Sequence, residues 1–90
     1  MDLSTVDPAL IEARGRYATV NGAYKDVMEA MQKTTQKACD SLRLVLQDEN
    51  KRSDHIAQVE MFVGMIASMV KTADELHEQR EALYPDAWGE

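Results

Sequence analysis

QDENKRSD, residues 47–54, is a run of eight residues without a single apolar side chain, and it divides the chain into two amphipathic segments. On both sides of this run, apolar residues recur at the spacing of a helix face. The 90 residues include only two Pro and four Gly, and aromatic residues make up 6%, so helix is favoured over sheet and over disorder. We therefore predict an all-α fold, with residues 1–90 as a single helical domain.

The predicted architecture is a long antiparallel helical hairpin. A helix of about residues 8–47 is followed by a loop over 48–53, a second helix over about 54–84 and a tail over 85–90. Asp7 is a good N-cap for the first helix, and Pro8 is tolerated in its first turn. Two rows of apolar or small residues then run at heptad spacing: Leu10, Tyr17, Tyr24, Met31, Ala38 and Val45 in one, and Ala13, Val20, Val27, Thr34 and Ser41 in the other.

One stretch of the first segment carries a conflicting signal. Asn21-Gly22 lies between residues that favour strands, and this dipeptide is typical of a β-hairpin turn. The heptad rows pass through it without a change of phase, and an isolated two-stranded ribbon is marginally stable at best. We favour helix, with a kink or break at residues 21–22 as an alternative that would give three helices. Residues 8–22 could thus continue the first helix, form a separate one or form a hairpin.

The second segment carries an apolar stripe wider than a two-helix seam requires. Ser53 or Asp54 is its expected N-cap, and Pro85 is expected to end it. Residues 8–20 folding back could cover the excess, and so could a second copy of the chain in a helical bundle. The in-phase heptads favour the second copy, so we expect a homo-oligomer, with a dimer favoured. The apolar positions are Ile56, Val59, Phe62, Val63, Ile66, Met69, Val70, Ala73, Leu76 and Leu83, with Met65 at the edge.

The most apolar stretch is MFVGMIASMV, residues 61–70. Glu60 and Lys71 bracket only ten residues, whereas a membrane span needs about 20. The stretch therefore belongs to the chain's own core or to a surface that meets a partner, a use that suits methionine. The residues that we predict for self-association or partner binding are Phe62, Met65, Ile66, Met69, Tyr17, Tyr24 and Trp88.

The C-terminal stretch YPDAWGE places Trp88 after the expected helix end. Tryptophan is a frequent anchor at interfaces, but Trp88 could equally fold back and cap the open end of the helical pair. Both readings stay open at this point.

No pattern typical of catalysis, cofactor binding or a metal site is found. His77 shares a helix face with Asp74, Glu78 and Glu81, but a solvated acidic face explains this cluster better than a metal site does. Cys39 is the single cysteine, and it lies on the apolar side of the first helix without a histidine near it in sequence. We expect no enzyme, no cofactor and no metal.

The net charge of −6 disfavours direct nucleic-acid binding, because the basic residues are scattered along the chain. Acidic residues concentrate after Thr72, as a solvated face or as a contact for a basic partner. MDLSTVDPAL has neither a basic start nor an apolar run, so we expect a cytoplasmic protein without a membrane partner, while signal-independent export stays open.

These observations predict a non-enzymatic protein-binding module, such as a small chaperone, adaptor or inhibitor, that acts through helix–helix contacts with an unidentified protein. The size and expected outline resemble those of small helical components of bacterial secretion systems and of small phage-encoded inhibitors. One alternative is therefore a structural subunit of a larger helical assembly, such as a secretion-system or phage component. A second alternative is an acidic decoy that inhibits a nucleic-acid-binding protein.

Overall fold

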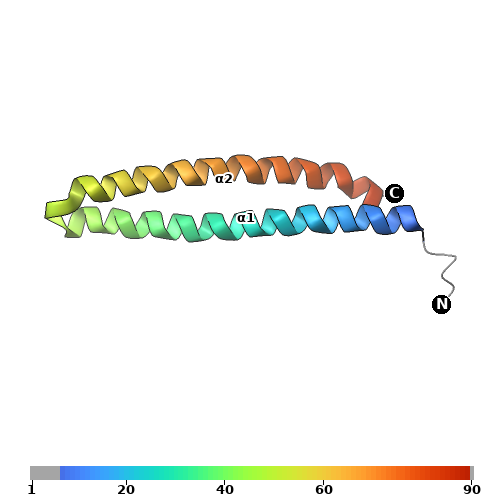
Figure 1. The fold of residues 1–90 in the computed structure, drawn as a ribbon, viewed down its shortest axis with the longest axis horizontal. Helices are drawn as coiled ribbons and strands as arrows, with labels where there is room; N and C mark the ends of the chain where they lie inside the picture. Colours follow the sequence, from blue (N-terminus) through green and yellow to red (C-terminus); the bar gives the residue numbers. More distant parts are fainter. Residues whose placement is uncertain (1–6, 90) are drawn as a thin grey trace.

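The computed structural model describes residues 7–89, and these form a helical hairpin (Figure 1). Helix α1 spans Pro8–Gln47, a single 3-10 turn η2 spans Glu49–Lys51, and helix α2 spans Arg52–Ala87. The two helices run antiparallel and pack along most of their length, and no strand occurs among the described residues. The prediction of an all-α helical hairpin is confirmed.

Helix α1 begins where the sequence predicts and continues without interruption. Asp7 is its N-cap, and the Asp7 Oδ1 atom accepts a hydrogen bond of 2.9 Å from the backbone nitrogen of Ala9. The helix passes through Asn21 and Gly22, so the structure contains neither the β-hairpin nor the break considered for this stretch. Gly22 does not adopt a positive φ angle, which a two-residue hairpin turn of this type would require.

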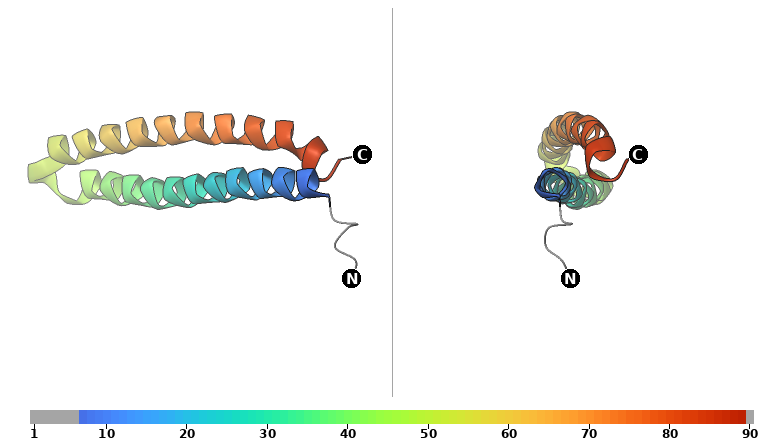
Figure 2. Two further views of the ribbon diagram at one scale, coloured as in Figure 1. Left: turned by 45° about the vertical axis from the view of Figure 1, so that its right-hand side comes forward. Right: turned by 90° about the vertical axis from the view of Figure 1, so that its right-hand side faces the viewer.

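Helix α2 is longer than predicted at both ends. It begins at Arg52, and it continues through Pro85 to Ala87, so the prediction that Pro85 ends the helix is wrong. A proline inside a helix removes one backbone hydrogen bond and bends the chain. Here the helix continues for two residues past the bend. The last turn of α2 indeed curves toward the start of α1 (Figures 1 and 2).

The seam between the helices follows the heptad rows of α1. Every residue in the two predicted rows is buried or half-buried, with Thr34, Ala38 and Ser41 the most buried of them. On α2 the matching positions repeat at alternating spacings of four and three, and they include two residues that a hydrophobic pattern does not mark, His55 and Arg80. The α2 seam positions are His55, Val59, Phe62, Ile66, Met69, Ala73, Leu76, Arg80, Leu83 and Ala87.

The core of this seam is thin. Among residues 7–89, the buried apolar residues are the small side chains Ala38, Ala73 and Ala87, and no large side chain is fully buried. The chain extends over 70 × 23 × 15 Å with a radius of gyration of 20.4 Å. A compact domain of this length would have a radius of gyration of about 12 Å. The hairpin is therefore a rod whose core is limited to the contact between its two helices.

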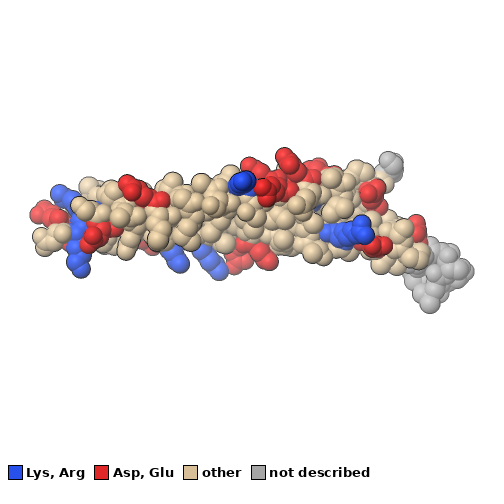
Figure 3. Space-filling model, turned by 45° about the horizontal axis from the view of Figure 1, so that its top comes forward, with Lys and Arg blue, Asp and Glu red and all other residues tan. Residues whose placement is uncertain are grey.

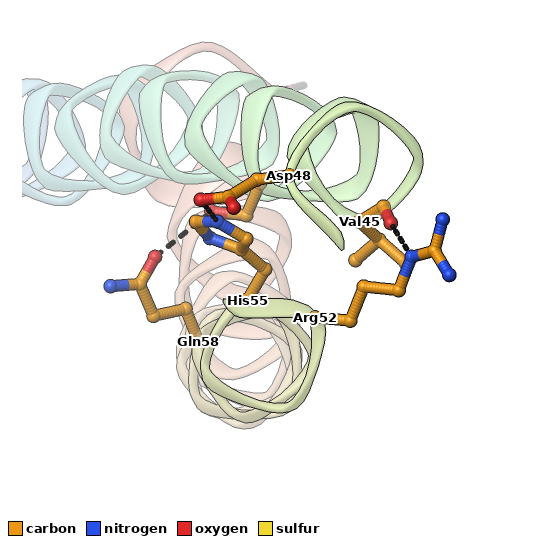
Figure 4. Close-up of polar contacts among 6 residues, drawn as sticks. Val45, Asp48, Arg52, His55 and Gln58 are labelled. Carbon is orange, nitrogen blue, oxygen red and sulfur yellow. Dashed lines mark hydrogen bonds and ion pairs between the residues drawn. The ribbon is translucent and has the colours of Figure 1, made fainter. Parts of the chain in front are cut away.

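Side chains close the connection between the helices (Figure 4). The Arg52 side chain donates a hydrogen bond of 2.8 Å to the carbonyl oxygen of Val45, in the last turn of α1, where carbonyls lack partners within the helix. The His55 Nε2 and Asp48 Oδ2 atoms lie 3.2 Å apart. These contacts fix the direction in which α2 leaves the connection.

Candidate functional site

The predicted interface residues fall into different environments. Phe62, Ile66 and Met69 lie half-buried in the seam, on the side of α2 that packs against α1. Met65 lies beside the seam and is exposed. The structure thus places three of the four residues predicted in this stretch in the contact between the chain's own helices, and their contact with a second chain stays a prediction.

The aromatic residues gather at the open end of the hairpin. The rings of Tyr17 and Tyr84 meet edge to face with centroids 5.9 Å apart, and those of Tyr17 and Trp88 do so at 6.3 Å. The guanidinium of Arg14 lies 4.2 Å from the centroid of the Trp88 ring, and the Arg14 Nε atom donates a hydrogen bond of 3.0 Å to the carbonyl oxygen of Ala87. Trp88 therefore caps the end of the helical pair, although half of its surface stays exposed.

A second cluster forms around Arg80 and shows how the flanks of the two helices are arranged. The guanidinium of Arg80 lies 4.4 Å from the ring centroid of Tyr24. Its two terminal nitrogens lie 2.9 Å from Asn21 Oδ1 and 3.0 Å from His77 Nδ1. Arg80 thus bridges Asn21 on α1 and His77 on α2, so these two residues lie on the same side of the seam.

Stepping by seven residues from Asn21 and from His77 toward the connection gives two rows on that same side. The α1 row continues to Met28, Thr35 and Leu42, and the α2 row continues to Val70, Val63 and Ile56. Five of these six residues are large apolar side chains, and all five are exposed. We call this surface the open flank and define it by Met28, Leu42, Ile56, Val63 and Val70.

Three further features extend the open flank along α1. Leu46 lies one turn beyond Leu42 and is 80% exposed. The exposed Cys39 precedes Leu42 by three residues. Around Met28, a shallow groove of about 680 Å³ runs from Tyr24 to Cys39, lined entirely by residues of α1. The six positions of the two rows carry no charged residue.

The other side of the hairpin is less continuous. Leu44 of α1 and Met65 of α2 are exposed there, but Lys37 lies one heptad before Leu44 in the same row of α1. Met61 is 54% exposed and lies away from the open flank, because two residues along a helix turn the side chain by about 200° from Val63. The apolar pattern of the sequence includes Ile56, Val63 and Val70, but it does not include Met28 and does not separate the flank residues from the seam residues.

Charged side chains gather away from the connection on α2. Acidic residues cluster over its C-terminal half, as the space-filling view shows (Figure 3). This cluster includes Asp74, Glu75, Glu78 and Glu81, which are all exposed. Arg80 is the one cation among them, and its guanidinium is turned toward Tyr24.

The residues capable of chemistry do not converge. Among residues 7–89, no three side chains of the types that bind metals lie close enough together to hold an ion. Cys39 is exposed, and His77 contacts Arg80 and Tyr24. At the connection, the hydrogen bond with His55 lowers the pKa of Asp48, and partial burial opposes this effect. This pair closes the hairpin and does not line a cavity.

One helical segment, Glu49–Ala87, is long and apolar enough to cross a membrane when judged by length and composition alone. Its most apolar 18-residue window has a mean hydropathy of 1.3, and only 6% of that window is buried. The apolar residues of the open flank that belong to α2 fall within this segment.

Comparison with protein-family models, with curated proteins and with solved structures finds no match to this chain.

Proposed function

We propose that this chain is a non-enzymatic protein-binding module that acts through helix–helix contacts, in the manner of a small chaperone, adaptor or inhibitor. The observation that carries the proposal is the open flank, two uncharged rows on the same side of the hairpin in which five of six positions hold exposed apolar side chains. Exposed apolar patches of this kind mark contact surfaces in soluble proteins.

The surface area of the chain supports a role in contact. The accessible surface is 6833 Å² for a mass of 10.1 kDa. A compact monomer of this mass exposes about 5300 Å². The excess reflects a rod with two helices and no third layer, and packing further helices against the rod would bury part of it. A second copy of the chain is the simplest source of such helices.

Protein is favoured over lipid and nucleic acid as the partner. Glu60 and Lys71 interrupt the apolar segment of α2 on the helix face away from the seam, and both side chains are exposed. An interfacial membrane helix carries a polar face rich in Lys and Arg, whereas the polar face of α2 is mainly acidic. With a net charge of −6, the chain also repels a phosphate backbone.

The experiment is affinity capture from the native host with three baits. Wild type is compared with Val63→Glu on the open flank and Met61→Glu on the opposite face, two positions of equal exposure at 55% and 54%. We expect wild type and Met61→Glu to retain the same protein, identified by mass spectrometry, and Val63→Glu to lose it. Equal capture by all three baits, or capture of nothing by any of them, would contradict binding through the open flank.

A further inference from the structure

Resting on the binding role proposed above, we infer that the open flank is the face on which two copies of this chain pack into a four-helix bundle. The occupant of the flank is thus a second hairpin, related to the first by a two-fold axis.

The pattern of apolar residues on the two helices indicates a bundle. In a two-stranded coiled coil, the two seam positions of each heptad are apolar and the flanking positions are often charged. Helices in a larger bundle are apolar at one flanking position as well. In this chain the third apolar position is present on both helices, through Met28 and Leu42 on α1 and through Ile56, Val63 and Val70 on α2.

The flank is suited to meeting a copy of itself. In a two-fold symmetric dimer the same patch serves both subunits, so it must complement itself. Each helix contributes a row of similar bulk, and the rows lie at similar heights because Leu42 and Ile56 both flank the connection. The groove around Met28 offers a recess for an apolar side chain of the second hairpin.

The size of the surface agrees with a stable dimer. From Tyr24, where the groove begins, to Leu46, the flank covers 22 residues of helix, which is about 33 Å. The open flank is therefore long enough for several turns of each helix of a second hairpin to lie against it, as an interface of standard size requires.

Charge also favours this face. Two chains that each carry −6 repel one another, and the repulsion is smallest where the contact itself is uncharged. Association through the open flank should therefore strengthen as salt screens the acidic residues of α2. A basic partner protein would show the opposite dependence on salt, so ionic strength distinguishes the two kinds of occupant.

Sedimentation equilibrium over a wide concentration range tests the inference. We expect wild type to approach twice its mass of 10.1 kDa, more completely at higher salt. Val63→Glu should sediment as the monomer with its helical circular dichroism retained, and Met61→Glu should sediment as wild type does. A wild type that stays monomeric, or a dimer that dissociates in Met61→Glu and persists in Val63→Glu, would overturn the inference.

A milder variant keeps the test sharp if Val63→Glu loses helix. Val63→Thr changes little in shape, and because the dimer uses the position twice, its dissociation constant should rise about tenfold or more. An unchanged dissociation constant would overturn the inference. A monomeric wild type that still captures a host protein through Val63 would also overturn it, while the proposed binding role would stand.

Discussion

Arg14 and Trp88 lie at opposite ends of the sequence, yet the guanidinium carbon of Arg14 is 4.2 Å from the centre of the Trp88 ring. The hydrogen bond from Arg14 to the Ala87 carbonyl adds a second contact to the last turn of α2. Ala87 itself is 1% exposed. These contacts explain why the helix continues past Pro85 and why the end of the hairpin is closed.

Replacing Trp88 should loosen this end without unfolding the rod. Trp88→Ala removes a cation–π contact and an edge-to-face contact with Tyr17, each of which contributes about 0.5–1 kcal/mol. We expect the free energy of unfolding in urea to fall by about 1–2 kcal/mol, and amide exchange in the last turn of α2 to accelerate. Trp88→Phe keeps an aromatic ring and should lose less stability than Trp88→Ala. An unchanged rate of amide exchange in Trp88→Ala would contradict a role of Trp88 in closing this end of the hairpin.

Gly22→Ala should stabilise the protein. Gly22 lies inside α1, and a Cβ atom built there meets no other atom within 4 Å. Alanine is favoured over glycine by about 1 kcal/mol in a helix interior, so the midpoint of urea unfolding should increase. The same change would destabilise a hairpin turn at Asn21-Gly22, where glycine is favoured for its positive φ. A loss of stability would therefore argue for the hairpin. Gly15→Ala, which has the same open surroundings, is the matched control.

The Asp48–His55 pair predicts a dependence of stability on pH. The pKa of Asp48 is lowered below its ordinary value of 3.8 in the folded chain, chiefly by the hydrogen bond with His55. A depressed carboxyl pKa contributes stability above pH 3.8, and this contribution disappears as pH falls through the folded value. Unfolding of wild type and Asp48→Asn should therefore differ near neutral pH and converge below pH 3.8. A difference that grows on acidification would contradict this assignment.

Lipid vesicles should not retain the protein. Most apolar residues of α2 face α1 in the seam or form the open flank, while Met61 and Met65 are exposed elsewhere. Glu60 and Lys71 lie exposed on the remaining surface. We expect the chain to stay at the bottom of a flotation gradient with neutral and with anionic vesicles. Movement with the vesicles to the top of the gradient would show that the segment Glu49–Ala87 enters a bilayer.

The sequence could predict α1 and its seam because apolar or small residues there recur at heptad spacing and charged residues lie only at other positions. Its apolar pattern also included seven of the ten seam positions of α2, but it could not predict Arg80, whose guanidinium lies over the ring of Tyr24. Likewise, Val63 and Val70 could not be told from the seam residues Phe62 and Met69 by hydrophobicity alone. The end of α2 was also out of reach, since it depends on contacts with Arg14, more than 70 residues away in the chain.

The most direct test of whether one hairpin is complete by itself is the thermal midpoint Tm measured at increasing protein concentration. If two copies share the open flank, mass action favours the associated folded state, and Tm rises with concentration in wild type and in Met61→Glu but stays constant in Val63→Glu. A wild-type Tm that is the same at every concentration, with a sharp and reversible transition, would show that one hairpin folds without a second copy and would contradict association through the open flank.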